Sequence, residues 1–400
     1  MTDKLTIEEV YKAKDVLKDV ARHPRLVPTK ICGDAEIYLK PECLQHTGSF
    51  KLLGAYYKIS QLTPEEKKRG VIACSAGNHA QGVALGATRN GIKSLICLPA
   101  GAPISKVEAT KHYGAEVCLV PGVYDDAYAK AIELRDKHGY TFVHPFDDPL
   151  VIAGQGTIGL EILEEKPDVE EIVVPIGGGG LISGLAFAVK TLRPDVKIYG
   201  VQAEGAPSMA ESLKLHRMIH LNSVSTIADG IAVKEPGVNT FDLVNRYVDD
   251  IVTVSEDEIA AAILYLIEKQ KLVAEGAGAV PVAAVMAGKI PVKGKKVVCL
   301  VSGGNIDVNT LNRVIARGLK VGGRLLTLTI DLADKPGQLS GVCNVIANLG
   351  ANVVSINHER TGNTHAINDC IIRVELETRN HEHVEQIKKA LHENGYKIIG

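Results

Sequence analysis

Short apolar runs alternate with longer mixed segments along the first three-quarters of the chain. The short runs are rich in Val, Ile and Leu and lack polar alternation, which is typical of strands buried on both faces of a sheet. We predict such strands at residues 36–40, 71–74, 94–98, 116–120, 141–143, 172–176, 197–202, 251–254 and 296–301.

Between these strands, apolar residues recur at the spacing of amphipathic helices. Thr6 with Glu9 forms a capping box at the first helix, and Ser255 with Glu258 forms one at a later helix. The other predicted elements are helices at residues 7–20, 49–62, 79–90, 104–112, 124–138, 181–191 and 277–287, with polar irregular chain near 204–247. This alternation predicts an α/β fold with parallel sheets covered by helices.

The pattern changes near residue 321, where Val321-Gly322-Gly323-Arg324 resembles a hinge. Beyond the hinge we predict strand 325–331, helix 338–349, strands 352–359 and 366–376, helix 384–394 and strand 396–399. The order βαββαβ is that of a ferredoxin-like α+β domain. The sequence therefore predicts a separate small domain at residues 325–400.

Composition narrows the class of protein. A chain of 400 residues exceeds what one core usually supports, so two or three domains are expected. The net charge of −2, the aromatic content of 4% and the absence of Trp argue against a nucleic-acid or membrane partner. No apolar run approaches the about 18 residues that span a bilayer, and the N-terminus lacks a signal-peptide profile. Eight cysteines without a CxxC pair predict free thiols and a cytoplasmic protein.

Lys51 stands at the start of a predicted helix, in Thr47-Gly48-Ser49-Phe50-Lys51. The partial positive charge of a helix N-terminus disfavours an ammonium group there. An amine so placed is shifted towards the neutral, nucleophilic form that makes a Schiff base. A solvated surface lysine is the alternative interpretation of this residue alone.

Three other loops follow predicted strands, where open parallel sheets bind ligands. Ser75 to Gly82 offers backbone and side-chain donors for a carboxylate or phenolate oxygen, or else an ordinary helix cap. Gly177-Gly178-Gly179-Gly180 suits a phosphate, or else a tight turn, and matches neither GxGxxG nor a P-loop. Ser302-Gly303-Gly304-Asn305 places a hydroxyl able to pair with a ring nitrogen, or else makes a simple turn.

One ligand, pyridoxal 5'-phosphate, has parts that match all four features. Its aldehyde matches the lysine, its phosphate matches the glycine loop, and its phenolate oxygen and ring nitrogen match the two polar loops. Metal chemistry fits less well, because HExxH is absent and His381 with His383 lie in a polar segment. We therefore predict no metal site.

With these motifs in order, residues 5–320 resemble the fold-type-II pyridoxal-phosphate enzymes, and among them the threonine dehydratases. The segment Asp229-Gly230-Ile231-Ala232-Val233 also matches. The tail resembles an ACT regulatory domain, with Asp334-Lys335-Pro336-Gly337-Gln338-Leu339 as its helix-opening turn. The resemblance implies a two-lobed catalytic unit at residues 1–320, similar to the tryptophan synthase β fold, with a small lobe near 47–149 and a large lobe from the remainder.

The resemblance also assigns roles. Lys51 would hold the cofactor and remove the α-proton, Asn78 would bond the phenolate oxygen, and Ser302 would face the ring nitrogen. The remaining cofactor contacts would come from Phe50, Gly177, Gly178, Gly179, Gly180 and Leu181, and the substrate carboxylate would be held by Ser75, Gly77, Asn78 and His79.

The implied reaction is loss of the β-hydroxyl of L-threonine as water, followed by hydrolysis of the product to 2-oxobutanoate and ammonia. L-Serine should also react and give pyruvate. The main alternative is deamination or racemisation of serine on the same scaffold. A nucleotide-binding oxidoreductase and a non-catalytic amino-acid sensor are weaker alternatives. Only Glu204 is acidic in residues 202–208, where related serine racemases bind a divalent metal, so no divalent ion is expected.

The small domain is expected to sense an amino acid, with isoleucine or valine as first candidates. The predicted effector loop is Pro336, Gly337, Gln338 and Leu339, where amides at a helix start could hold a carboxylate. A lone four-stranded sheet leaves exposed edges, so pairing with a second copy is expected, in a homodimer or homotetramer.

Overall fold

A computed structural model describes residues 5–360 and 369–400 of the protein. The chain divides into two compact units, Met1–Leu311 and Asn312–Gly400. Within the described residues, none of the helices combines the length and the apolar character needed to cross a membrane.

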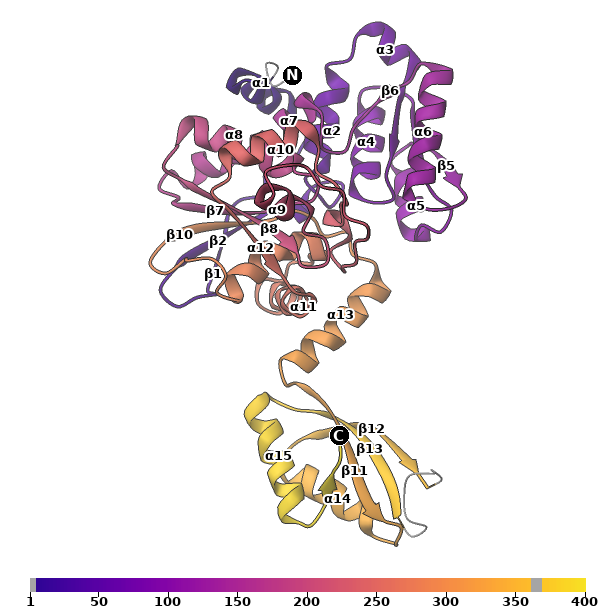
Figure 1. The fold of residues 1–400 in the computed structure, drawn as a ribbon, viewed down its shortest axis with the longest axis vertical. Coiled ribbons are helices and arrows are strands. Elements are labelled where there is room, and N and C mark those ends of the chain that lie inside the picture. The colour runs from indigo at the N-terminus through magenta and orange to yellow at the C-terminus, as the bar shows by residue number, and fades with distance from the viewer. Residues whose placement is uncertain (1–4, 361–368) are drawn as a thin grey trace. The chain divides into compact units, whose positions relative to one another are not determined.

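The larger unit contains a six-stranded sheet that is parallel except at one edge (Figure 1). Its strand order is β1-β2-β10-β7-β8-β9, and only β1 runs antiparallel to its neighbour. The strands are β1 Val27–Thr29, β2 Glu36–Pro41, β7 Glu171–Pro175, β8 Lys197–Ala203, β9 Asp250–Val254 and β10 Lys296–Val301.

A second, fully parallel sheet lies between β2 and β7 in the chain, in the order β5-β4-β3-β6. Its strands are β3 Val71–Cys74, β4 Ser94–Pro99, β5 Glu116–Val120 and β6 Thr141–Phe142. Neighbouring residues of β3 belong to different hydrophobic clusters. Val71 belongs to the cluster that contains residues of α4, and Ile72 belongs to the cluster that contains Ala127 of α6. Both faces of this sheet are therefore buried, as its continuous apolar strands predict.

Helices cover both sheets of the larger unit. They are α1 Ile7–Leu17, α2 Lys51–Ser60, α3 Pro64–Arg69, α4 Asn78–Arg89, α5 Ile104–His112, α6 Tyr124–His138, α7 Pro149–Glu165, α8 Gly180–Leu192, α9 Ser208–Lys214, α10 Val238–Tyr247, α11 Glu256–Tyr265 and α12 Gly276–Met286. Helix α7 packs against both α2 and α8, so it joins the helix that begins at Lys51 to the helix that follows the glycine loop.

The C-terminal unit begins within α13 Val308–Val321 and contains a four-stranded antiparallel sheet in the order β12-β13-β11-β14. Its elements are β11 Leu325–Ala333, α14 Gln338–Asn348, β12 Asn352–Glu359, β13 Asp369–Glu377, α15 His381–Glu393 and β14 Lys397–Ile398. This confirms the predicted ferredoxin-like order. The start of the strand predicted at 366–376 lies partly outside the described residues.

The sequence pattern did not predict β1, α3, α7, α9, α10 or α13. Helix α7 has most of its residues buried, so it lacks the polar face that marks an amphipathic helix. The region near 204–247 was predicted to be irregular, but α9 and α10 lie within it. Helix α13 could have been found, because Leu311, Val314, Ile315 and Gly318 follow helical spacing.

The close approach of α7 and α8 gives a stability prediction. A Cβ atom at Gly184 of α8 would lie 2.1 Å from the Ile152 carbonyl oxygen of α7. Backbone cannot move aside as a side chain can, so we expect Gly184→Ala to lower the free energy of unfolding by about 1–3 kcal/mol. Urea denaturation measures this change.

Gly33→Ala is the matched control, because a Cβ atom at Gly33 would have nothing within 4 Å. Its free energy of unfolding should stay within about 0.5 kcal/mol of the wild type. Equal denaturation midpoints for both variants would show that the α7–α8 contact tolerates a methyl group.

Candidate active site

The lysine loop and the serine loop are joined by main-chain hydrogen bonds. Ser49 and Gly303 form an antiparallel bridge, and the Phe50 amide donates to the Ser302 carbonyl at 3.1 Å. The Gly304 amide donates to the Gly48 carbonyl at 2.9 Å. These bonds hold the start of α2 against the loop that follows β10.

Asn305 ties the third loop to the other two. Its side-chain amide donates to the Thr47 carbonyl and to the Asn78 side-chain oxygen, each at 2.7 Å. Gly48 leaves room for this contact, because a Cβ atom there would lie 2.4 Å from the Asn305 side-chain oxygen. Gly48 also has a φ of 68°, which favours glycine. The structure thus brings together three loops that the sequence analysis had singled out separately.

Asn78 in turn donates to Glu275 at 2.6 Å, a residue that the sequence analysis missed. Glu275 is the N-cap residue of α12 and is 3% exposed. Its carboxyl pKa is raised to about 7, chiefly because burial disfavours the charged form, with a further contribution from the negative charge of Asp229. In the sequence, a glutamate before the Gly-Ala run of residues 276–279 indicates only an ordinary helix start, so nothing there pointed to a site residue.

Lys51 is the first residue of α2, and its Nζ donates to the Pro145 carbonyl at 2.7 Å. The same Nζ lies 5.3 Å from the centre of the Phe50 ring. Burial lowers the pKa of Lys51 to about 8, while the negative charge of Glu275 opposes the shift. The pKa is lowered, as the position of Lys51 predicted, but the principal cause is burial and not the helix N-terminus.

The glycine loop lies beside the same segment of chain. Phe146, the neighbour of Pro145, packs so closely that a Cβ atom at Gly178 would lie 2.5 Å from its ring. Gly179 has a φ of 97°, and the Thr240 hydroxyl donates to the Gly178 carbonyl at 2.6 Å. The loop ends at Gly180 and Leu181, whose amides open α8 and have no acceptor within the helix.

His79 is 3% exposed and neutral. Burial, followed by the positive charge of Lys51, lowers its pKa to about 3. Its Nε2 lies 2.8 Å from the Val143 carbonyl, which can only accept, so Nε2 carries the proton. Nδ1 is then a buried acceptor, and it has no hydrogen-bond partner among the described residues.

Ser75 uses its hydroxyl oxygen locally. It accepts a hydrogen bond from the Gly77 amide at 3.2 Å, which bends the loop into the start of α4. Ser302 is 2% exposed, and its hydroxyl lies 3.5 Å from the Ala277 carbonyl. Both hydroxyls keep capacity for a further hydrogen bond.

These residues fit pyridoxal phosphate. Among the described residues, the Ser49 hydroxyl and His79 Nδ1 are buried without a partner, as expected where a polar ligand completes the site. An amine with a lowered pKa suits an aldehyde, and the first amides of α8 suit a phosphate.

The segment from His144 to Asp148 connects these parts, and the sequence analysis assigned it no role. His144 Nδ1 accepts from the Asp147 amide at 2.7 Å, and Asp147 caps α10 by accepting from the amides of residues 238–240. Asp148 caps α7 by accepting from the Leu150 amide at 2.8 Å. Asp148-Pro149 is a recognisable helix start, so this pair could have revealed both the segment and α7.

Glu204, in the region where no divalent ion was expected, pairs with a lysine. Lys289 Nζ lies 3.5 Å from a Glu204 carboxylate oxygen and 2.7 Å from one of Glu258. It also donates to the Thr253 carbonyl at 2.9 Å. An ammonium group of the chain itself therefore supplies positive charge at this position.

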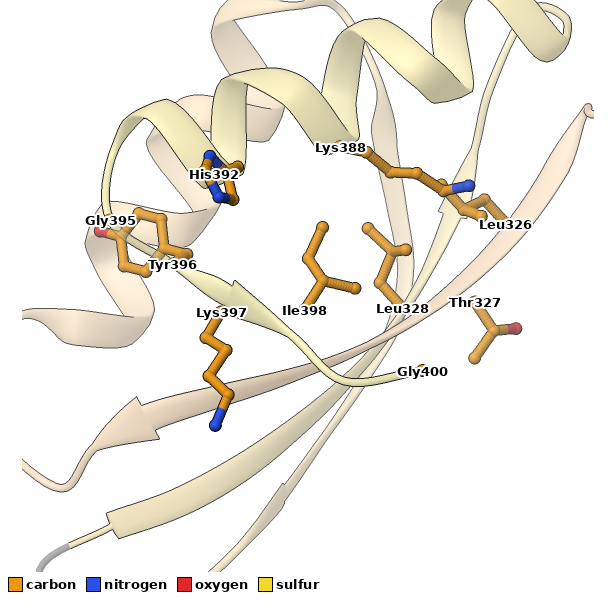
Figure 2. Close-up of a pocket in the computed structure, with 10 residues that line it drawn as sticks. All are labelled: Leu326, Thr327, Leu328, Lys388, His392, Gly395, Tyr396, Lys397, Ile398 and Gly400. Atoms are coloured by element: carbon orange, nitrogen blue, oxygen red, sulfur yellow. The ribbon is translucent and has the colours of Figure 1, made fainter.

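In the C-terminal unit, the predicted effector loop lies at the start of α14. Gly337, with a φ of 91°, is the N-cap residue, and Leu339 is 36% exposed. A separate cavity of about 700 Å³ lies between α15, β14 and the start of β11 (Figure 2). Leu326, Leu328 and Ile398 form its apolar part, whereas none of the predicted effector residues lines it.

Comparison with known proteins agrees with this geometry. A family described as pyridoxal-phosphate dependent enzyme matches residues 20–303, and the ACT domain family matches residues 326–395. The chain is 51% identical over 397 residues to an L-threonine ammonia-lyase of Thermotoga maritima, covering 98% of this chain and 99% of that protein.

Two solved structures are similar to the larger part of the chain. The processed form of threonine deaminase isoform 2 from Solanum lycopersicum has a TM-score of 0.73 at 39% identity, covering 78% of this chain and 93% of that one. Maize serine racemase has a TM-score of 0.74 at 32% identity, and the match covers 80% of this chain and 99% of the racemase chain.

The raised pKa of Glu275 gives a pH-dependent prediction. Between about pH 4.5 and 7 the folded chain holds a proton on Glu275 that the unfolded chain has lost. The contribution of Glu275 to stability therefore falls as the pH rises through this window and is constant above it. Because Gln cannot ionise, the stability of Glu275→Gln relative to the wild type should rise by up to about 3 kcal/mol across the window.

Denaturation at a series of pH values, with both chains free of cofactor, measures this difference. Glu108→Gln, at an exposed position of α5, is the control and should follow the wild type at every pH. A constant difference between Glu275→Gln and the wild type would show that Glu275 titrates in its ordinary range.

Proposed function

The chain belongs to the pyridoxal-phosphate dependent enzymes and ends in an ACT domain, and we propose that it deaminates L-threonine to 2-oxobutanoate and ammonia. The observation that carries the proposal is the set of hydrogen bonds from Asn305 to Thr47 and Asn78 and from Asn78 to Glu275, which holds the Lys51 loop beside Ser302. The identity with the Thermotoga maritima lyase, at 51% over nearly the whole of both chains, supports threonine as the substrate.

Lys51 is assigned the central part. Nζ would hold the cofactor, and as a neutral amine it would accept the proton from the substrate α-carbon. A pKa of about 8 leaves a usable fraction of neutral amine near pH 7, where an ordinary lysine would have almost none. Pyridoxal phosphate, when bound, supplies an electron sink for the charge left by that proton.

The loops around Lys51 hold and orient the ligands. We assign the phosphate to the amides of Gly177 to Leu181, the phenolate oxygen to Asn78 and the ring nitrogen to Ser302. Glu275 positions Asn78 by accepting from its amide at 2.6 Å, which directs the remaining N–H of that amide. Phe50, next to Lys51 and partly buried against the core, is assigned to the cofactor ring.

The substrate carboxylate is assigned to the start of α4. The Gly77 and Asn78 amides lie at the positive end of this helix, which favours an anion. A neutral His79 adds no positive charge there and offers only an acceptor at Nδ1. We therefore assign carboxylate binding to the amides with Ser75, and assign His79 to a hydrogen-bond donor of the substrate, its hydroxyl or its ammonium.

Serine chemistry is the second candidate, favoured by the similarity to maize serine racemase at 32% identity. Serine lacks only the methyl group of threonine, and one methyl contact changes kcat/KM by about 10–200-fold. Serine should therefore react more slowly and give pyruvate. Accumulation of D-serine would instead favour the racemase.

The first test replaces Lys51 by Ala. We expect Lys51→Ala to lose at least about 10²–10⁴-fold in kcat for threonine, because the variant lacks both the covalent attachment and the proton acceptor. Production of 2-oxobutanoate from threonine measures the loss. Lys68→Ala, at an exposed position of α3, is the control and should keep full activity.

Two results would count against the assignment. Turnover of Lys51→Ala comparable to that of the wild type would remove Lys51 from the chemistry. A wild-type kcat/KM that is higher for serine than for threonine would replace the proposed substrate.

We further propose that the ACT domain binds an amino-acid effector at residues 336–339. Gly337 has a positive φ that sets the direction of the first amides of α14. Gly337→Ala should strain this turn and weaken the binding of isoleucine or valine to the full-length chain by about tenfold. Isothermal titration calorimetry measures the affinity.

Gly350→Ala tests the same kind of change at the other end of α14. Both glycines have a positive φ, and a Cβ atom at either position would have nothing within 4 Å, so the local strain of the two variants is comparable. Gly350→Ala should bind the effector as the wild type does. Absence of heat with every amino acid tested would leave the domain without a sensing role.

A further inference from the structure

We propose that Asp334, His358 and Cys370 bind a divalent transition-metal ion, with Zn²⁺ as the best match, in the C-terminal unit. One ligand atom from each side chain lies within 4.8 Å of the other two. No metal site was predicted from the sequence, where HExxH is absent. These three residues lie far apart in the chain and match no metal-binding spacing.

The sheet brings the three side chains together. Cys370 of β13 pairs with Leu332 near the end of β11, two residues before Asp334. His358 of β12 pairs with Ile372, which lies two residues beyond Cys370 on β13. Because alternate residues of a strand share a face, Cys370, Ile372 and His358 lie on the same face of the sheet. This is the face with the core, since Cys370 and Ile372 both belong to the core of the domain.

The three residue types define the class of ion. Thiolate, imidazole and carboxylate together are typical ligands of Zn²⁺, whereas Mg²⁺ and Ca²⁺ prefer oxygen ligands alone. Three protein ligands leave a fourth position for water or for a small molecule, as in zinc sites that are open to solvent.

The geometry needs only a small contraction. Two ligand atoms at tetrahedral angles around Zn²⁺ lie about 3.5 Å apart, given bonds of about 2.0–2.3 Å. Cys370 is 3% exposed and fixed in the core, but Asp334 and His358 are exposed, so their side chains can rotate towards it. The thiol fixes the position of the ion, and the two outer ligands complete the site.

An ion pair is the competing explanation for Asp334. The Arg360 guanidinium lies 3.1 Å from one Asp334 carboxylate oxygen. The Arg360 side chain is 67% exposed, and exposed pairs of this kind contribute only about 0–1 kcal/mol. The pair also uses one of the two carboxylate oxygens and leaves the other for a metal ion.

Cobalt binding tests the proposal on the full-length chain after treatment with a chelator. Four-coordinate Co²⁺ with a thiolate ligand gives visible ligand-field bands at longer wavelengths than the cofactor absorption. Added Zn²⁺ should abolish these bands, because it displaces Co²⁺. We expect the wild type to bind one Co²⁺ with these bands. Cys370→Ser should lose them, because without the thiolate, which releases its proton on binding, the two exposed ligands do not hold Co²⁺ in a four-coordinate site.

Two further variants separate metal binding from folding. Asp334→Asn changes an exposed side chain, so the unfolding temperature should be unchanged. Loss of a contact that only supports a metal ligand typically lowers affinity about 10–100-fold, and loss of the Asp334 carboxylate should lower Zn²⁺ affinity by at least as much. Cys343→Ser, at the half-buried cysteine of α14, is the matched thiol control and should keep both the bands and the affinity.

Two outcomes would overturn the proposal. One is the absence of ligand-field bands in the wild type at saturating Co²⁺. The other is equal Zn²⁺ affinity for Asp334→Asn and the wild type. Neither readout depends on turnover, so this test stands apart from the test of the proposed activity.

Discussion

The catalytic unit depends on one carboxamide, that of Asn305. Its side-chain amide donates both to Thr47, in the chain that leaves β2, and to Asn78, which follows β3 of the other sheet. Together with the bond from Asn78 to Glu275, this side chain fixes the distance between the loops of two separate sheets. Asn305 is half-buried, so losing these bonds would leave polar groups partly removed from water without partners, at a cost of about 1–3 kcal/mol.

The same burial governs the charges around the site. Lys51 and His79 both have a lowered pKa, and Glu275 has a raised one, with burial as the largest cause in each case. Each shift moves the group towards its neutral form. The site thus presents an amine with a usable neutral fraction and a neutral imidazole, although lysine and histidine are often charged in water.

Much of this arrangement could be predicted from the sequence. The strands are continuous apolar runs, so β3, β5 and β10 lie at the predicted residues, and glycine-rich loops mark where strands end. The links between loops could not be predicted, because Glu275 and Asn305 act through single side-chain contacts across long separations. Helix α7 was missed for a related reason: burial on nearly all sides removes the amphipathic pattern.

The parallel pairing of β2 with β10 places residue 36 beside residue 296. The whole second sheet is synthesised between these two strands, so the contacts that create the site are among the most distant in the chain. Contacts of high sequence separation form late and slowly. On the ribosome, Lys51 is therefore made early but has no partner loop until Asn305 emerges. A chain arrested before that point has Lys51 without the burial that lowers its pKa, so we expect this amine to become nucleophilic only late in synthesis.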